Sequence, residues 1–393
     1  MITVIGLDGS PLSSSAEERL AEATLVMGGR RHLREIDLPV EVPVVALRDD
    51  PEAALQQVLE APGPVVVLAS GDPGFFGVLR LLRERLPADQ VEVLPGLSSV
   101  ALAFARAGLP WDDAVVVSAH GRDPRRAIAV CRAHAKVAVL TAAGAGPAEL
   151  AAALIGVERQ LCVVERVGLP GERVTWLGPE AAAARQDWDP LNVVLVLDDA
   201  RLVATEKGWL AGREQPAGWA LPDDRFQHRN GMVTKPEVRA LVLARLGPRL
   251  GDLVWDVGAG SGSVAVECAR LGAAVIAVER DDPTHLTANV AAYGVGVQVV
   301  HGAAPAALDG LPRPDAVFVG GGGLDVVRAV VACRPTRLVV ALATVERVAP
   351  VLEALADWSP DAVLLDSKRL VPLGDGSRLV PTNPVFVVSG ALP

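Results

Sequence analysis

The sequence predicts an α/β protein with parallel sheets. Half of its 393 residues are hydrophobic, only 4% are aromatic, and there are 38 glycines. This composition suits parallel sheets covered by helices, because their buried strands are rich in Val, Leu and Ala. Short apolar runs also end repeatedly in glycine-rich turns that lead into helical patterns. A chain of this length can hold two or three domains, each with its own core.

Composition also limits the functional classes. The net charge is −10, without the basic excess that a nucleic-acid binder needs. No stretch of about 18 uncharged apolar residues predicts a membrane span, and the first residues read as a strand with no basic leader. The four cysteines are far apart and predict buried thiols. We therefore expect a cytoplasmic protein with no metal, no nucleic-acid partner and no membrane contact.

The first 200 residues alternate strand and helix patterns. Strands are predicted at residues 2–5, 24–27, 64–70, 91–94 and 114–117, and helices at 13–22 and from 99 to about 107. Several of these strands run directly into polar or glycine-rich loops, at the edge where α/β sheets collect ligands. These loops contain Gly6, then Gly71, Asp72, Pro73 and Gly74, then Ser98 and Ser99, and finally His120 and Arg122.

A second motif lies between residues 253 and 279. An apolar run leads through Gly258, Gly260 and Gly262 into a helical pattern, and a second apolar run ends at Glu279. Glycines let a ligand lie directly on the backbone, and the helix that follows points its free N–H groups at that ligand. An acid at the end of the second strand is suited to bind ribose hydroxyls.

Three interpretations of this turn are open. A dinucleotide site requires a glycine at the sixth position of the motif, where this chain has Ser263. Asp256, two residues before the first glycine, fits S-adenosylmethionine better, because that ligand carries an ammonium group and a sulfonium. The third interpretation is a glycine turn with no ligand.

The first 200 residues and the last 173 are separated by a break in the pattern. Residues 201–220 carry scattered charge, Gly and Pro without a strand and helix rhythm. We predict a domain at 1–200, a linker at 201–220 and a second domain at 221–393.

The N-terminal loops resemble those of a known family. Gly71-Asp-Pro-Gly, Pro95-Gly-Leu-Ser-Ser and Ser118-Ala-His-Gly-Arg, in this order, are similar to the tetrapyrrole methylases of the cobalamin pathway that methylate meso carbon 5 of a late precorrin. The resemblance covers residues 1–200 and implies two α/β lobes with S-adenosylmethionine in the cleft between them. It places Gly6, Gly71, Asp72, Pro73, Gly74, Ser98 and Ser99 at the cofactor. The opening turn departs from the pattern, since Asp8 and Gly9 replace the last two residues of Gly-x-Gly-Pro-Gly.

The second half resembles the decarboxylating precorrin methyltransferases that act at meso carbon 15. The likeness rests on Gly231-Met-Val-Thr-Lys, the glycine turn, Gly302-Ala-Ala-Pro, the run from Pro314 to Gly323 and Asn383-Pro-Val-Phe. It implies a Rossmann-like S-adenosylmethionine-dependent methyltransferase domain. Ala303 stands where that family often has an aspartate, so a carboxylate contact near the adenine is expected to be absent. The predicted cofactor residues here are Thr234, Asp256, Gly258, Ala259, Gly260, Ser261, Gly262, Glu279, Ala303 and Ala304.

Together the two halves are similar to the bifunctional precorrin-6Y C5,15-methyltransferases (decarboxylating). The resemblance implies methylation at both meso carbons and loss of carbon dioxide from a ring acetate. The meso carbons of a reduced tetrapyrrole are electron-rich and the sulfonium methyl is already activated, so positioning and exclusion of water carry much of the chemistry. No Ser–His–Asp or Cys–His constellation is recognisable, and no catalytic acid or base can be named.

A precorrin carries acetate and propionate carboxylates, so basic side chains near either site are candidates to bind it. His120 and Arg122 could do so in the first half, with a purely structural role as the alternative. Gly321 and Gly322 form a glycine wall that suits a flat ligand. His32, His285 and His301 are predicted to be surface or core histidines. The basic patch of the second half, which could instead be a solvated helix face, contains Arg225, His228, Arg229, Lys235 and Arg239.

Other functions fit parts of these patterns. The substrate could already contain cobalt, or the chain could be a regulator that binds S-adenosylmethionine or a tetrapyrrole without turnover. A methyltransferase of proteins or nucleic acids is a third possibility, but the Asn/Asp-Pro-Pro-Tyr/Trp motif is missing where Phe318 and four glycines stand. Since methylase domains of both kinds tend to associate, we expect a homo-oligomer.

Overall fold

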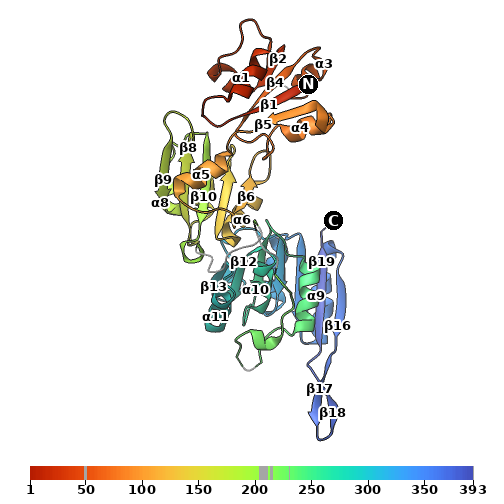
Figure 1. The fold of residues 1–393 in the computed structure, drawn as a ribbon. Helices are drawn as coiled ribbons and strands as arrows, with labels where there is room; N and C mark the ends of the chain where they lie inside the picture. The colour runs from red at the N-terminus through yellow and green to blue at the C-terminus, as the bar shows by residue number, and fades with distance from the viewer. Residues whose placement is uncertain (48–50, 203–210, 213–215, 230, 393) are drawn as a thin grey trace.

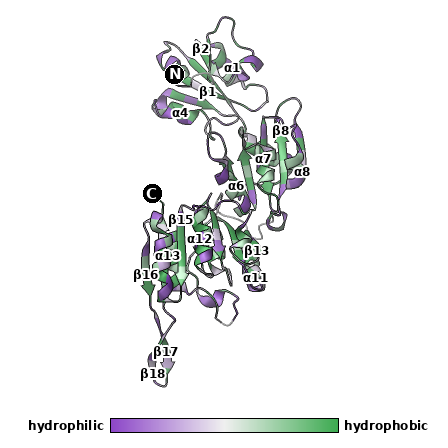
Figure 2. Ribbon diagram, turned by 180° about the vertical axis from the view of Figure 1, so that it is seen from behind, coloured by the Kyte–Doolittle hydropathy of each residue, from purple (hydrophilic) through white to green (hydrophobic). Residues whose placement is uncertain are grey.

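The computed structural model describes all residues except 48–50, 203–210, 213–215, 230 and 393. Three sheets follow one another along an elongated molecule, with a separate hairpin at the far end from the N-terminus (Figure 1). The strands are largely hydrophobic, as Figure 2 shows, because each sheet is covered by helices. The predicted α/β class with a two-lobed first half and a Rossmann-like second half is confirmed.

The first sheet is parallel throughout, in the order β3-β2-β4-β1-β5. Its strands therefore end at one edge, where their following loops meet. Ser13 caps the first helix, since its Oγ accepts the N–H of Ala16 at 3.3 Å. The elements are β1 (Ile2–Leu7), α1 (Ser14–Ala21), β2 (Leu25–Gly28), α2 (His32–Glu35), β3 (Val44–Ala46), α3 (Pro51–Glu60), β4 (Val65–Ser70), α4 (Leu79–Arg83), the 3-10 turn η1 (Ala88–Gln90) and β5 (Val91–Leu94).

The second sheet is mixed, in the order β6-β7-β10-β8-β9, and only its β6–β7 pair is parallel. It forms the second lobe of the first half. Ser98 Oγ caps α5 by accepting the N–H of Val100 at 3.2 Å. The elements are α5 (Ser99–Ala107), β6 (Val115–Ser118), α6 (Pro124–Ala133), β7 (Lys136–Leu140), α7 (Pro147–Ala152), β8 (Gln160–Glu165), β9 (Arg173–Leu177), α8 (Pro179–Ala184), β10 (Asn192–Leu197) and η2 (Asp199–Arg201).

The third sheet has seven strands in the order β13-β12-β11-β14-β15-β19-β16. The first five are parallel, β19 runs antiparallel to them, and β16, which pairs antiparallel with β19, has their direction again. The strand order reverses between β11 and β14, and ligands of open α/β sheets bind at such a point. The first elements are η3 (Asp223–Arg225), α9 (Pro236–Leu246), β11 (Leu253–Val257), α10 (Ser263–Arg270), β12 (Ala274–Glu279), α11 (Thr284–Ala292), β13 (Val297–His301), η4 (Ala306–Leu308) and β14 (Ala316–Val319).

The remaining C-terminal elements complete this sheet and add the hairpin. The hairpin pairs β17 with β18 and projects beyond the sheet (Figure 1), with Leu370, Leu373 and Leu379 exposed on it. It was not predicted from the sequence. The elements are α12 (Leu324–Ala332), β15 (Arg337–Leu342), η5 (Val345–Arg347), α13 (Val348–Ala354), η6 (Ala356–Trp358), β16 (Asp361–Leu365), β17 (Lys368–Leu373), β18 (Gly376–Pro381) and β19 (Val385–Ala391).

The two halves of the chain touch through α6. Ala129 and Ala133 of this helix belong to the same apolar cluster as Leu253 of the third sheet. Arg132 Nη1 donates to Gln298 Oε1 of β13 at 3.0 Å. The predicted linker at 201–220 lies partly outside the described residues, so the division at that place stays a prediction.

Candidate functional site

The C-terminal glycine turn has the backbone that its sequence predicts. Gly258, Gly260 and Gly262 all have positive φ, at 73°, 55° and 73°. A Cβ at Gly258 would stand 2.8 Å from the backbone nitrogen of Gly321, and one at Gly262 would collide with Leu286. Gly260 differs, because a Cβ there would meet no atom within 4 Å. The close approach of the Gly321 backbone thus requires a glycine at 258, Leu286 packs against Gly262, and Gly260 borders open space.

That open space is a cavity of about 470 Å³ at the carboxyl ends of β11, β12 and β14. Glu279 ends β12 beside it. Its Oε2 accepts the N–H of Gly260 at 2.6 Å, and its Oε1 accepts the N–H of Asp281 at 2.9 Å. Of the residues predicted at this site, the cavity is lined by Arg229, Gly258, Gly260, Ser261, Glu279, Ala303, Ala304, Gly321 and Gly322.

Asp256 corrects one expectation, because it does not face this cavity. Its side chain is 1% exposed and lies under the glycine turn, where Oδ2 accepts the N–H of Ala265 at 2.9 Å. Oδ1 is buried without a hydrogen-bond partner. Burial, with a smaller contribution from the charge of Glu279, raises the pKa of Asp256 to about 7. Asp256 therefore holds the start of α10 and does not line the cavity.

Three members of the basic patch at 225–239 lie in different environments. Arg229 lines the cavity, and Lys235 Nζ forms an ion pair with Asp223 Oδ2 at 2.8 Å. Arg239 is fully buried, and its guanidinium contacts Glu267, the carbonyl oxygen of Thr234 and that of Leu221. The predicted substrate contact of Arg239 is therefore wrong: its donors hold the backbone at Leu221 and Thr234 onto the domain. Thr234 takes part through its backbone, and neither it nor Ala259, Gly262 or Lys235 lines the cavity.

A larger cavity of about 730 Å³ lies between the two lobes of the first half. Gly71, Ser99 and His120 line it. Gly6 lies just beneath, where a Cβ would collide with the backbone of Gly71 and Gly96. The loops after β1, β4 and β5 thus meet at the carboxyl edge of the first sheet.

The other residues predicted at this cleft support its walls. Asp72 Oδ1 accepts the N–H of Gly74 at 2.8 Å and shapes the loop, which also contains Pro73. Arg122 lies over the ring of Phe76, with 6.0 Å from its Cζ to the ring centroid, and neither it nor Ser98 lines the cavity. Asp8, where the turn departs from the family pattern, joins two loops, because its Oδ2 accepts the N–H of Leu97 at 2.8 Å.

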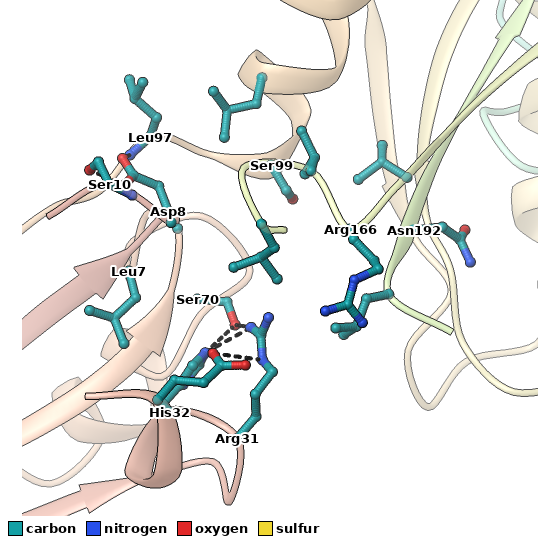
Figure 3. Close-up of a pocket in the computed structure, with 18 of the residues that line it drawn as sticks. Leu7, Asp8, Ser10, Arg31, His32, Ser70, Leu97, Ser99, Arg166 and Asn192 are labelled. Carbon is teal, nitrogen blue, oxygen red and sulfur yellow. Dashed lines mark hydrogen bonds and ion pairs between the residues drawn. The ribbon is translucent and has the colours of Figure 1, made fainter. Parts of the chain in front are cut away.

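Sequence reasoning missed a polar cluster on the wall of this cleft. Arg31, His32 and Ser70 lie together there, and Arg166 comes from the other lobe (Figure 3). His32 is 7% exposed, and burial followed by the charge of Arg31 lowers the pKa of this imidazole. The available signal was the glycine pair at 28–29 and the basic residues that follow strand 24–27. In the second half, His285 likewise lines the C-terminal cavity.

The described part of the chain contains no group of three or more His, Cys, Asp or Glu side chains placed to hold a metal ion. Among the described helices, none has the length and apolar character needed to span a membrane. Cys131, Cys162 and Cys268 are buried as predicted, whereas Cys333 is half-buried. Burial raises the pKa of the Cys131 thiol to about 12, so this residue is an unreactive core thiol.

Comparison with known proteins agrees with the two resemblances. A family model described as tetrapyrrole (corrin/porphyrin) methylases matches residues 5–183, and one described as a precorrin methyltransferase domain matches residues 224–390. The chain is 37% identical to a Sinorhizobium protein named precorrin-6Y C(5,15)-methyltransferase [decarboxylating], over 98% of this chain and 94% of that relative.

Two shorter relatives have one activity each in their names. A cobalt-precorrin-7 C(5)-methyltransferase of Salmonella typhimurium is 30% identical, over 51% of this chain and all of the relative. A probable cobalt-precorrin-6B C(15)-methyltransferase (decarboxylating) of Pyrobaculum calidifontis is 34% identical, over 43% of this chain and 94% of the relative.

Proposed function

Because the chain belongs to the family of precorrin-6Y C5,15-methyltransferases (decarboxylating), we propose that it methylates a precorrin at meso carbons 5 and 15, with S-adenosylmethionine as the methyl donor. A ring acetate loses carbon dioxide in the same overall reaction. The observation that carries this proposal is a cavity at the carboxyl ends of the parallel strands in both the first and the third sheet. Two methyl transfers to different carbons require two alignments of one macrocycle, which two cavities can supply.

We assign carbon 5 to the first half and carbon 15, with the decarboxylation, to the second. The two family models leave residues 184–223 unmatched between them, in support of domains at 1–200 and 221–393. The two single-activity relatives are each aligned over almost their full length with about half of this chain. Each activity therefore needs only one such half.

The residues of the C-terminal cavity fit S-adenosylmethionine. Gly260 leaves room for a ligand against the backbone, and each carboxylate oxygen of Glu279 keeps acceptor capacity for the ribose hydroxyls. Ala303 offers no carboxylate, so backbone groups of the loop at 302–304 would contact the adenine edge. When bound, the cofactor supplies a methyl group already activated by a positive sulfur. The chain itself contributes position and a cavity that excludes water.

Replacing Glu279 with alanine should weaken the second activity alone. The loss of charge-assisted hydrogen bonds to the ribose amounts to about 1.5–3 kcal/mol, or a roughly 10- to 100-fold weaker cofactor affinity at that site. Methylation at carbon 15 and release of carbon dioxide should fall together, while methylation at carbon 5 continues. The masses of the products formed at limiting cofactor concentration measure the carbon 15 and carbon 5 reactions separately. The exposed Glu346 provides a control, since Glu346→Ala removes the same charge outside the cavity.

Unchanged cofactor affinity in the Glu279→Ala chain would contradict the proposed position of the ribose. In the Glu279→Gln chain one side-chain oxygen can still accept from Gly260, so we expect a smaller loss than with alanine. A fall in carbon 5 methylation equal to that at carbon 15 would contradict the assignment of the two activities to different halves.

Incubation of the chain with methyl-labelled S-adenosylmethionine and a mixture of precorrins tests the function itself. We expect a product that has gained two labelled methyl groups and lost carbon dioxide. Binding of cofactor and tetrapyrrole without a labelled product would favour the non-catalytic regulator. A parallel incubation with cobalt-containing precorrins distinguishes the two versions of the substrate.

We also propose that the chain works as a homo-oligomer in the cytoplasm. The exposed leucines of the β17–β18 hairpin would be covered in an assembly, and the four free cysteines suit a reducing compartment. Sedimentation of the purified chain measures its oligomeric state.

A further inference from the structure

Arg31 is held at the cleft by two neutral groups. Its Nη2 lies 2.9 Å from Nε2 of His32 and 3.3 Å from Oγ of Ser70, and these two atoms are 3.1 Å apart (Figure 3). A guanidinium has donors only, so Nε2 of His32 is the nitrogen with the lone pair and the ring proton is on Nδ1. These contacts use Nη2, and further N–H donors of the guanidinium are left for a ligand.

The positive charge of Arg31 is weakly compensated. His32 is buried, with its pKa lowered, and is therefore neutral beside Arg31. Glu35 Oε2 lies 4.0 Å from Arg31 Nε, at the limit of an ion pair, and its side chain is 48% exposed. A contact of this kind to an exposed carboxylate stabilises little. Arg31 is thus a fixed cation on the wall of a cavity, which favours an anionic ligand.

Arg166 supplies a second cation from the opposite lobe. It follows β8 with a φ of 51°, a left-handed conformation that is uncommon for a residue other than glycine and that concentrates at functional sites. The backbone is held there because the N–H of Arg166 donates to the carbonyl oxygen of Leu191 at 2.7 Å, and Nε donates to that of Pro170 at 3.0 Å. Nη1 forms an ion pair with Asp189 Oδ2 at 3.4 Å, which leaves Nη2 for a ligand, and the side chain of Arg166 is 38% exposed. Figure 3 shows both guanidinium groups turned toward the space between the lobes.

We propose that Arg31 and Arg166 bind peripheral carboxylates of the tetrapyrrole from opposite sides of the cleft, and that His32 and Ser70 are positioning residues for Arg31. This inference rests on the proposed function of the first half. Arginine suits the role because its planar donors match a carboxylate and it stays charged at any working pH. Two like charges that face one cavity repel each other until an anion lies between them.

The test measures KM and kcat for methylation at carbon 5 with the full-length chain. Arg31→Leu and Arg166→Leu should each raise KM for the tetrapyrrole roughly 10- to 100-fold, the loss expected for a charge-assisted hydrogen bond, with the carbon 15 reaction unchanged. Arg34→Leu is the matched control. Arg34 is exposed on α2, which Arg31 immediately precedes, and it lies outside the cleft, so this variant loses the same charge and should keep its KM.

A second readout separates charge from shape. A porphyrin with acetate and propionate side chains should bind the wild-type chain more tightly than its methyl ester does. Arg31→Leu should abolish most of this preference while the affinity for the methyl ester stays unchanged. His32→Gln keeps a neutral acceptor for Arg31 and should retain the wild-type KM, whereas His32→Leu should raise KM with kcat little changed.

The outcomes distinguish this inference from the proposed function. If wild type methylates carbon 5 and Arg31→Leu has an unchanged KM, the carboxylate contact is absent and the inference fails alone. If Arg34→Leu raised KM as much as Arg31→Leu does, the effect would come from the net charge of the chain and not from a contact of Arg31 with the substrate. An equal loss of acid and ester binding would indicate a structural role for Arg31. If wild type itself neither binds nor methylates a tetrapyrrole, the proposed function fails first.

Discussion

Gly260→Ala should reduce carbon 15 methylation and decarboxylation about 100-fold, the loss expected when reacting groups are displaced by about 1 Å. Gly260 lines the C-terminal cavity, and a Cβ there would meet no protein atom within 4 Å. The added methyl group therefore occupies the space assigned to the cofactor. Product masses under saturating substrate measure the loss, and calorimetry measures cofactor affinity.

The matched control for this variant is Gly294→Ala. Gly294 has a φ of 58°, close to the 55° of Gly260, and a Cβ there would also meet nothing within 4 Å. Gly294 does not line the C-terminal cavity. Both variants should lose about 1 kcal/mol of stability, because alanine is strained at positive φ. Equal activity of the two variants would mean that the cofactor does not lie against Gly260.

Asp256→Asn should change how stability depends on pH. The pKa of Asp256 is raised to about 7 in the folded chain, against about 3.9 for an aspartate in an unfolded chain. Between these values the folded state binds more protons than the unfolded state. The contribution of Asp256 to stability is therefore present at low pH and is lost as the pH rises through about 7. Asparagine removes this dependence, while its side-chain oxygen can still accept from Ala265.

Urea denaturation of both chains at several pH values measures this effect. Wild type should lose about 2 kcal/mol relative to Asp256→Asn between about pH 5.5 and about pH 7.5. The quantity to compare is the difference in the free energy of unfolding between the two chains at each pH, because the other titrating groups affect both chains alike. Parallel curves would show that Asp256 is ionised at neutral pH in the folded chain, stabilised by the free N–H groups of α10.

The turns of this chain were predictable because their chemistry is local. The glycine turn at 258–262 joins a strand to a helix as predicted, and the helices predicted at 13–22 and 99–107 begin at Ser14 and Ser99, where Ser13 and Ser98 cap them. Most of the predicted strands differ from the observed ones by one or two residues at an end.

The errors concern side chains whose environment is set by distant parts of the chain. Arg239 was interpreted as part of a surface patch, but Glu267 and the carbonyl oxygen of Leu221 complete its burial. Asp256 was expected at the ligand because of its place before the glycines, yet α10 covers it. The cluster of Arg31, His32 and Ser70 was missed because its members are some 40 residues apart in the sequence. They meet only because β2 and β4 are neighbours in the sheet.

The contact of α6 with the third sheet and the β17–β18 hairpin were also unpredicted. Ala129 and Ala133 have the ordinary pattern of a helix face, and nothing local shows that this face covers another domain. The strands of the hairpin contain Pro372 and Pro381, residues that are rare inside sheets.

The claim that the two methyl transfers use separate sites is tested most directly by the rate of carbon 5 methylation in a chain whose second site is impaired. A precorrin already methylated at carbon 15 and decarboxylated is offered, with methyl-labelled S-adenosylmethionine, to the full-length Gly260→Ala chain. If the two sites are separate, this chain should transfer the label to carbon 5 at the wild-type rate, although its own carbon 15 reaction is about 100-fold slower. A carbon 5 rate that falls together with the carbon 15 rate would show that both methyl transfers use one site.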